Sequence, residues 1–579
     1  MSGGRASRRS VLLALAAGGV GLGGCGGLPG SGDVVSGARL ADDPRIGLLQ
    51  VIPTGPVRGA SPEEIVRGFL LAAGAGQDEH PVARRFLTPR AVDTWRPDAG
   101  AVLVLGQPAI AALDASASPA DADSWVVQVS AEQQAALDAD GHYAARAPGT
   151  GWSAQVLLRR ERDEWRIDEV FDGVLLTEID ASRTLRSFPV WFGAQDLSQL
   201  VADLRWFSYG SDTATRLVTE LLDGATSWFA PAVATGAPPG TRLRLGTVPV
   251  TGGTATVELT DEALQASPEQ RGLLLSQLRA TLSTLPGVSQ VAVTVGGTDL
   301  TRASSDELDI PRSRAATDAR LVLLGPSGLS RWDRTAVRAV TGVTLGTAAE
   351  GSTHPAVSPQ GGPFAVLAGG DTLLRLQRPG GPVSTVLRSS APLTPPSMDR
   401  LGWVWTVQRT SRVTPLVVPA DAATAAENVA LDEDFDGSVL RFAVARDGAR
   451  AAVVTRTPSG RPGVRAYGVD RDAAGRPRRL TGPSDELLPG AAEVVDLAWL
   501  LDDSVVLLAR DEPGKDLAPV VVPLGGAPRW LPAAPGAVSV AAGWSERDIV
   551  IGTAEGTLLT RSGASWVVAA EGTDPAYPG

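Results

Sequence analysis

The segment Arg441-Phe442-Ala443-Val444-Ala445-Arg446-Asp447-Gly448, followed by the apolar residues 450–454, decides the fold class of the C-terminal half. It predicts a strand, a tight turn and a second strand, because glycine in an Asp-Gly pair supplies the positive φ that such a turn needs. Four similar copies precede further apolar runs: His354-Pro355-Ala356-Val357-Ser358-Pro359-Gln360-Gly361, Pro396-Ser397-Met398-Asp399, Leu497-Ala498-Trp499-Leu500-Leu501-Asp502-Asp503, and a weaker one at residues 538–543.

The copies recur about every 40–55 residues, which is the length of one blade of a β-propeller. Helical periodicity is absent from residues 315–579, where short apolar runs alternate with Gly, Pro and Asp-Gly turns. The length of this region, divided by the repeat, predicts an all-β propeller of five or six blades. Radial closure of such a ring would hide the strand edges.

Residues 187–300, just before the repeats, have a mixed pattern that predicts an α+β domain. Apolar residues repeat at helical spacing within residues 213–222 and share one face: Leu217, Val218, Leu221 and Leu222. A second amphipathic helix is predicted for residues 273–285 and ends at Pro286-Gly287. Strands are predicted for residues 188–192, 254–259 and 288–295.

Residues 46–180 predict another α+β domain. Its first helix begins at Ser61-Pro62-Glu63-Glu64, which combines a cap residue, a proline at the first helical position and acids at the positive helix end. A second helix is predicted for residues 82–87, and strands for residues 125–129, 152–158 and 165–170. Helices that precede a curved antiparallel sheet are typical of a cystatin-like or NTF2-like cone.

Cys25, the single cysteine, closes a segment that reads as a bacterial lipoprotein signal. A positive region with Arg5, Arg8 and Arg9 precedes an apolar run that is too short to span a bilayer of roughly 30 Å. Leu22-Gly23-Gly24-Cys25 resembles a lipobox, although alanine or serine is more usual than Gly23. We predict a signal peptide at residues 1–24, acylation of Cys25 with chains such as palmitate, and a flexible tether over residues 25–45. An ordinary secretory signal is the alternative.

The charge of the chain excludes some partners. The formal net charge is −12, and removal of residues 1–24 would remove three arginines and no acid, leaving −15. Nucleic-acid binding needs a basic face, so the composition argues against it. It also argues against electrostatic attachment to anionic lipid, so membrane attachment must come from the acyl anchor.

The best metal candidate is the acidic segment before Ser438. Asp432, Asp434 and Asp436, with glycine at the next position, match the first half of a calcium loop. The twelfth position is Ala443, where a bidentate glutamate should stand, so the segment is not an EF-hand. We therefore predict a solvated acidic turn and no metal, and calcium held by these three aspartates is the alternative.

No catalytic constellation is recognisable in the sequence. The histidines are predicted to lie in loops and the only lysine in a polar turn: His80, His142, His354 and Lys515. The tryptophans of the repeats are predicted to form core between blades, with a carbohydrate-stacking platform as the alternative: Trp403, Trp405, Trp499 and Trp544. We therefore predict a protein that is not an enzyme and needs no cofactor.

Taken together, the chain resembles the actinobacterial LpqB lipoproteins. The most specific segment is Leu217-Val218-Thr219-Glu220-Leu221-Leu222-Asp223-Gly224, which continues through Trp228-Phe229-Ala230-Pro231 and looks like the GerMN module of sporulation and germination proteins. Ala83-Arg84-Arg85-Phe86-Leu87-Thr88-Pro89 resembles the N-terminal domain of the family. Pro396-Ser397-Met398-Asp399 with Gly402-Trp403-Val404-Trp405 resembles its propeller.

This resemblance implies a lipid-anchored protein on the extracytoplasmic face of the cell membrane. It implies contact with the extracytoplasmic sensor domain of an MtrB-type histidine kinase, and modulation of two-component signalling in cell-wall and division homeostasis. A propeller lipoprotein that binds or processes cell-wall glycan is the alternative.

Overall fold

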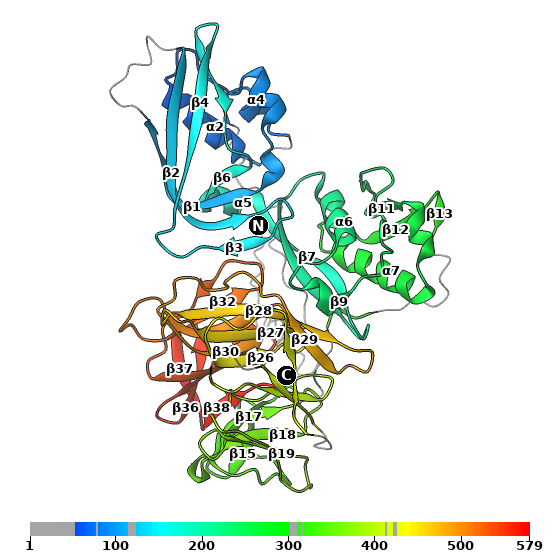
Figure 1. Ribbon diagram of the computed structural model, residues 1–579, viewed down its shortest axis with the longest axis vertical. Helices are drawn as coiled ribbons and strands as arrows, with labels where there is room; N and C mark the ends of the chain where they lie inside the picture. The colour runs from blue at the N-terminus through cyan, green and yellow to red at the C-terminus, as the bar shows by residue number, and fades with distance from the viewer. Residues whose placement is uncertain are drawn as a thin grey trace, which may run out of the picture. The chain divides into compact units, whose positions relative to one another are not determined.

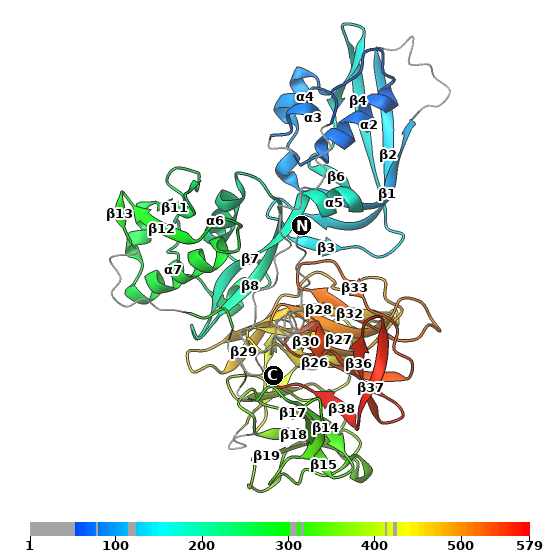
Figure 2. The same ribbon diagram turned by 180° about the vertical axis from the view of Figure 1, so that it is seen from behind.

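The computed structural model describes residues 53–76, 79–113, 123–300, 310–313, 316, 318–410, 414–420 and 425–579 (Figures 1 and 2). Residues from Gln50 onward form one compact unit. The predicted signal peptide, Cys25 and the tether lie outside the described residues. None of the helices in the described part is both long enough and apolar enough to cross a membrane.

The first part of the chain packs three short helices on a sheet. The helices are α2 (Pro62–Ala73), α3 (Pro81–Arg84) and α4 (Pro89–Thr94). Helix α2 begins where the sequence predicts, and Ser61 and Glu64 close a capping box there: the Ser61 hydroxyl accepts from the Glu64 amide and the Glu64 carboxylate accepts from the Ser61 amide. The predicted helix over residues 82–87 is wrong in extent, because Phe86 and Leu87 leave the helix to join Ile167 by backbone pairing.

The sheet of this part is long and antiparallel except at one edge. Its strands are β1 (Ala101–Ala112), β2 (Ser124–Leu137), β3 (Tyr143–Ala145), β4 (Gly151–Glu161), β5 (Glu164–Glu169) and β6 (Val174–Thr177), in the order β5-β4-β2-β1-β6 with β3 on β2. Alternate residues of β2, such as Val127 and Val129, pack with Ile65 and Phe69 of α2. The short helix α5 (Glu178–Thr184) leads to the next part.

The second part is the predicted α+β domain with two small sheets. The strands β7 (Leu185–Ala194), β8 (Leu200–Ser208) and β9 (Val233–Ala234) form one, and β10 (Val250–Thr251), β11 (Thr254–Leu259), β12 (Gln290–Val295) and β13 (Thr298–Asp299) form the other. Its helices are α6 (Thr213–Asp223) and α7 (Pro268–Leu282). Strands β11 and β12 are parallel, and α7 makes the crossover between them.

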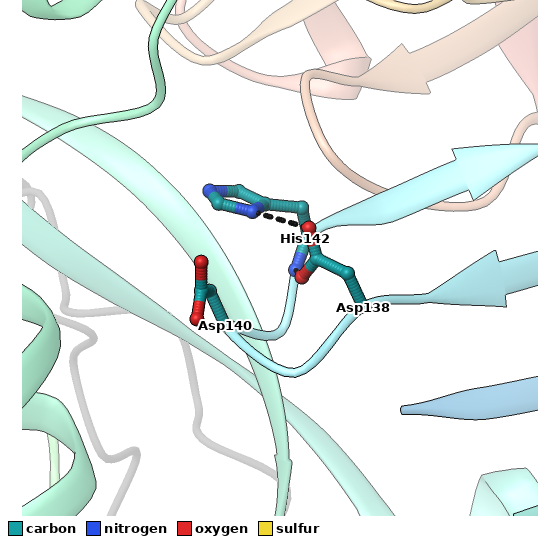
Figure 3. Close-up of side chains that lie close together, drawn as sticks. All are labelled: Asp138, Asp140 and His142. Atoms are coloured by element: carbon teal, nitrogen blue, oxygen red, sulfur yellow. Dashed lines mark hydrogen bonds and ion pairs between the residues drawn. The ribbon is translucent and has the colours of Figure 1, made fainter. Parts of the chain in front are cut away.

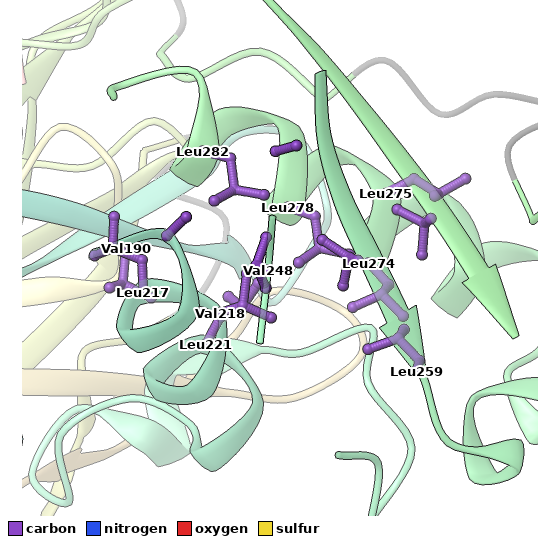
Figure 4. Close-up of a cluster of buried hydrophobic side chains, with 14 of the residues drawn as sticks. Val190, Leu217, Val218, Leu221, Val248, Leu259, Leu274, Leu275, Leu278 and Leu282 are labelled. Carbon is purple, nitrogen blue, oxygen red and sulfur yellow. The ribbon is translucent and has the colours of Figure 1, made fainter. Parts of the chain in front are cut away.

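The core of the second part lies between its helices and strands (Figure 4). Leu217, Val218 and Leu221 share the predicted apolar face of α6, and the structure packs them with Leu274 and Leu278 of α7. Helix α7 begins at Pro268, five residues before the predicted start at 273, and Ser267 and Gln270 close a capping box there. The first turn, residues 268–271, is polar and not buried, so no apolar residue marks this start, whereas ten of the eleven residues from Gly272 to Leu282 are buried and leave that part without the two-sided pattern of an amphipathic helix.

The third part is a propeller of six blades, within the predicted range of five or six. The first three blades contain β14 (Leu321–Gly325), β15 (Gly328–Trp332) and β16 (Val337–Ala339); β17 (Thr353–Val357), β18 (Phe364–Ala368), β19 (Leu373–Gln377) and β20 (Ser384–Arg388); and β21 (Ser397–Met398), β22 (Trp403–Thr406), β23 (Leu416–Pro419) and β24 (Glu427–Asn428).

The other three blades follow the same order from the inside to the outside. They contain β26 (Ser438–Val444), β27 (Arg450–Arg456), β28 (Pro462–Arg471) and β29 (Pro477–Thr481), with β25 (Ala430–Leu431) added outside; β30 (Glu493–Leu500), β31 (Ser504–Arg510), β32 (Ala518–Pro523) and β33 (Arg529–Trp530); and β34 (Ala537–Ala541), β35 (Val550–Thr553), β36 (Thr557–Ser562) and β37 (Ser565–Glu571).

The ring closes with a strand from the end of the described chain. Strand β38 (Thr573–Ala576) pairs antiparallel with β14, with Ala576 opposite Val322 and Thr573 opposite Leu324. The innermost strand of the first blade therefore comes from the C-terminal side, and the other three come from the start of the propeller. Each of the five sequence copies corresponds to the inner pair of strands of one of the other blades.

Candidate functional site

The propeller encloses a cavity of about 110 Å³ on its central axis, and this cavity is the candidate site. Residues of the six innermost strands line it, because each blade places its first strand at the axis. His354 and Asp574 stand at the beginnings of β17 and β38, whereas Arg446 follows the end of β26. Since the blades repeat one strand order, their innermost strands run in the same direction, and these residues mark opposite ends of the channel.

Arg446 closes one end of the channel. Its Nε donates to the carbonyl oxygen of Pro578 at 2.9 Å, and its Nη groups donate to the carbonyl oxygens of Trp499 and Ala542 at 2.9 and 2.6 Å. The guanidinium also lies 4.8 Å from the centre of the Trp544 ring. Burial lowers the pKa of Arg446 to about 10. The cation therefore remains charged at neutral pH and ties the last residues to the channel wall.

An ion pair crosses the middle of the channel. The Nε of Arg441 on β26 donates to Oδ1 of Asp496 on β30 at 2.8 Å. The other oxygen of Asp496 accepts from the backbone amide of Val540 on β34 at 2.8 Å. These bonds link three neighbouring blades and leave both carboxylate oxygens partnered. The Arg441–Asp496 ion pair therefore stabilises the ring. Because both oxygens of Asp496 are engaged, Asp496 is not one of the two free carboxylates that glycoside hydrolysis needs.

At the end of the channel away from Arg446, His354 lies between two carboxylates. Its Nδ1 is 3.9 Å from Oδ1 of Asp371, in the turn between β18 and β19, and its Nε2 is 3.9 Å from Oδ1 of Asp574. The prediction that His354 lies in a loop is wrong, because His354 belongs to strand β17, and the sequence did not reveal either neighbouring carboxylate. No local pattern could reveal them, because Asp574 belongs to the closing strand at the far end of the propeller sequence.

The predicted calcium residues are not gathered around one point. Asp432 forms an ion pair with Arg479 at 3.1 Å, and Asp434 and Asp436 are exposed. Within the described ranges, these aspartates do not belong to a group of acids or histidines with ligand atoms close enough to share an ion. The geometry favours the acidic turn over the calcium alternative.

One group elsewhere has ligand atoms close together: Asp138, Asp140 and His142, in the turn between β2 and β3 (Figure 3). Oδ2 of Asp138 lies 2.8 Å from Nδ1 of His142, and Oδ1 accepts from the His142 amide. These bonds account for the turn without an ion.

Burial of the nearby Glu220 on α6 raises the pKa of that carboxyl to about 7, while Arg205 opposes the shift and Asp140 adds to it.

The other predicted residues lie where the sequence places them. Lys515 is exposed and pairs with Asp511 at 3.0 Å and Glu512 at 2.9 Å, so it is a solvated turn residue. Trp405 and Trp499 are buried, and their indole N–H groups donate to Asp399 and to the carbonyl of Ala443. Buried rings cannot stack on a sugar, so these two tryptophans are core, as predicted.

The second part of the chain is bonded to the propeller. The carboxylate of Asp196, after β7, accepts two bonds from Arg400 at 2.6 and 2.7 Å. Arg450 of β27 donates to the carbonyl oxygen of Ala202 at 3.0 Å, and Phe229 packs on Ala449. A bidentate charged pair and a buried apolar contact therefore join segments within the compact unit that begins at Gln50.

Comparison with family models covers three segments of the chain. The model described as the LpqB N-terminal domain matches residues 55–182. The model described as sporulation and spore germination matches residues 189–301. The model described as the LpqB beta-propeller domain matches residues 327–578.

Comparison with individual proteins gives the same family. Lipoprotein LpqB of Streptomyces coelicolor is 29% identical over 621 aligned positions, which cover 100% of this chain and 99% of that protein. Lipoprotein LpqB of Thermobifida fusca is 30% identical over 51% of this chain and 48% of its own length. Among solved structures, TolB of Acinetobacter baumannii covers 45% of this chain and 67% of its own, with 14% identity and a TM-score of 0.34. The tandem GerMN domains of GerM from Bacillus subtilis cover 26% and 59%, with 14% identity and a TM-score of 0.19.

Proposed function

Because the chain belongs to the LpqB lipoprotein family, we propose that it is a lipid-anchored protein of the extracytoplasmic face of the cell membrane. We further propose that it is not an enzyme, and that it binds the sensor domain of an MtrB-type histidine kinase and modulates two-component signalling in cell-wall and division homeostasis. The observation that carries the proposal is the match over the full length to lipoproteins of this name, which includes the propeller and the GerMN-like part.

Anchoring explains how modest affinity can be enough. A lipid at Cys25 confines the protein to a thin layer beside the membrane, where the kinase sensor domain also lies, and so raises the effective concentration of one partner for the other. A sensor domain with two conformations responds only if the lipoprotein binds them with different affinity.

The soluble chain from Gly26 is expected to bind the isolated sensor domain of the kinase with a Kd of roughly 1–100 μM, or about −8 to −5.5 kcal/mol. Titration calorimetry checks the affinity, and crosslinking checks the contact. A heat-unfolded sample of the same chain is the control for non-specific association. Absence of binding when both proteins are folded would contradict the proposed function.

A further inference from the structure

Trp206 on strand β8 bonds to both of the other parts of the described chain. Strand β8 is an edge of its sheet, and the Trp206 amide donates to the carbonyl oxygen of Gly141, in the turn between β2 and β3, at 2.8 Å. The Trp206 indole donates to the carbonyl oxygen of Gly525, in the propeller, at 2.7 Å. A Cβ on Gly141 would lie 2.8 Å from the Trp206 carbonyl oxygen, so the turn sits directly on the backbone of β8.

A buried carboxylate with incomplete bonding lies beside this contact. The side chain of Glu220, on α6, is 13% exposed, and its carboxylate accepts no hydrogen bond from the residues that the structure describes. It pairs with Nε of Arg205 on β8 at 3.6 Å, which is too long for a hydrogen bond. That Nε is itself buried without a hydrogen-bond partner. Buried polar groups are nearly always satisfied, so this pair is an exception that needs a reason.

The charge of Arg205 is already balanced by another acid. The Arg205 side chain is 1% exposed, and its Nη1 lies 2.9 Å from Oδ2 of Asp203 on the same strand. That oxygen also accepts from the amide and the hydroxyl of Thr226, at 3.0 and 2.8 Å, which hold Asp203 in place. Glu220 is therefore a surplus negative charge in a largely buried site, where an ionised carboxyl without its own partner costs free energy.

The neighbouring charges leave this surplus in place. Burial is the main cause that raises the pKa of the Glu220 carboxyl to about 7. Asp140, in the turn between β2 and β3, and Asp223, on α6, raise this pKa further, whereas Arg205 and His142 lower it. The opposing effects of the two cationic groups are smaller than the effect of burial.

Two further basic side chains near Glu220 have acidic partners of their own. In the turn between β2 and β3, Nδ1 of His142 lies 2.8 Å from Oδ2 of Asp138 (Figure 3). Arg216, one helical turn before Glu220 on α6, pairs with Asp98 of the first part at 3.2 Å. Neither group forms an ion pair with Glu220, so a proton is the simplest way to neutralise this carboxyl.

We propose that Glu220 makes the contact between β8 and the turn at residues 138–142 sensitive to protons: the turn docks more firmly when this carboxyl is protonated and loosens when it ionises. The loosening has a physical cause, because separation of the turn from β8 lets water reach the ionised carboxylate and moves it away from Asp140. This device needs no partner protein and stands apart from the proposed function.

The direction of the effect follows from the pKa of Glu220 in the two states. In the docked state burial raises this pKa to about 7, and in the open state water returns it toward the ordinary value of 4.5. The docked state therefore binds the proton more tightly, so docking is strongest at low pH and weakens as the pH rises toward 7. With these values, the ratio of docked to open turns falls about tenfold between pH 6 and pH 8.

Hydrogen exchange of the Trp206 amide measures this opening, because the amide is bonded to Gly141 only while the turn is docked. In the soluble chain from Gly26, the protection of this amide, corrected for the intrinsic effect of pH on exchange, is expected to be about tenfold greater at pH 6 than at pH 8. In Glu220→Gln, which keeps the shape and removes the charge, protection is expected to be equal at both pH values.

Two control variants separate Glu220 from other ionisable groups. His142→Gln removes the nearby imidazole, a group that ordinarily changes charge in this pH range, and keeps an N–H for Asp138. Glu269→Gln removes the same charge as Glu220→Gln from the exposed first turn of α7. Both variants are expected to retain the tenfold change in the protection of the Trp206 amide.

NMR of the wild-type chain, labelled with ¹³C at the glutamate carboxyls, gives a direct measurement that does not rely on how the variants fold. The Glu220 signal is assigned by its absence from Glu220→Gln and is expected to titrate near pH 7. Titration near pH 4.5 would overturn the inference. So would a change in Trp206 protection that persists in Glu220→Gln, or one that disappears in His142→Gln.

Discussion

Replacement of Cys25 by alanine is expected to release the protein from the membrane fraction almost completely. Burial of an acyl chain in the membrane contributes about 0.8 kcal/mol of binding free energy per CH₂, and stable anchoring needs more than one chain. The predicted mature charge of −15 opposes attraction to anionic lipid. We therefore expect the lipid predicted on Cys25 to supply the attachment, and the measurement is the distribution of the protein between membrane and soluble fractions.

Labelled palmitate and a matched variant make the Cys25 experiment specific. Gly23→Ala retains the cysteine and places the more usual residue in the lipobox, so this variant is expected to incorporate the label and stay with the membrane. Cys25→Ala is expected to incorporate none. Recovery of Cys25→Ala in membranes, with lipid label on another residue, would show that the lipobox interpretation is wrong.

The propeller could be predicted from the sequence because its blades are built from local contacts. Each inner pair of strands is joined by a tight turn, and Gly448, with φ of 73°, adopts the positive φ that the Asp-Gly pair predicts. The blade that escaped detection joins β14 to β38, so its strands lie at opposite ends of the propeller sequence. A search for repeats within one continuous segment cannot find this blade, because its strands come together only when the ring closes.

Helix boundaries show a different limit. The start of α2 was predictable because Ser61 and Glu64 form the capping box within four residues. The same motif at Ser267 starts α7, but burial of most of that helix removes the polar face on which the amphipathic pattern depends. The predicted helix over residues 82–87 ends early because Leu87 pairs with Ile167, a contact between residues far apart in sequence.

The candidate site was the least predictable feature. The spacing of Asp432, Asp434 and Asp436 matches a calcium loop, but spacing does not fix side-chain direction, and Asp432 pairs with Arg479. By contrast, His354, Asp371 and Asp574 show no pattern in sequence, because three different segments of the propeller bring them together. The ring closure that hid the sixth blade also hid this site.

Asp399→Ala is expected to lower the free energy of unfolding of the propeller by about 3–5 kcal/mol, because it breaks a buried charged pair and removes several hydrogen bonds. The carboxylate is fully buried. One oxygen accepts from the amides of Leu401 and Trp403, and the other accepts from the Trp405 indole at 2.9 Å and from Arg471 at 2.7 Å. Its loss leaves the Arg471 guanidinium, whose side chain is 4% exposed, without its carboxylate.

Urea unfolding, monitored by tryptophan fluorescence, measures the loss in the free energy of unfolding caused by Asp399→Ala. Two control variants separate the effect of the charge from that of the side-chain shape. Asp399→Asn keeps one acceptor oxygen in place and is expected to cost less than alanine. Asp511→Ala removes a carboxylate from an exposed pair with Lys515 and is expected to change stability by at most about 1 kcal/mol. Asp399 orders the backbone of the turn between β21 and β22 and neutralises Arg471. Equal free energies of unfolding for Asp399→Ala and Asp511→Ala would contradict that role.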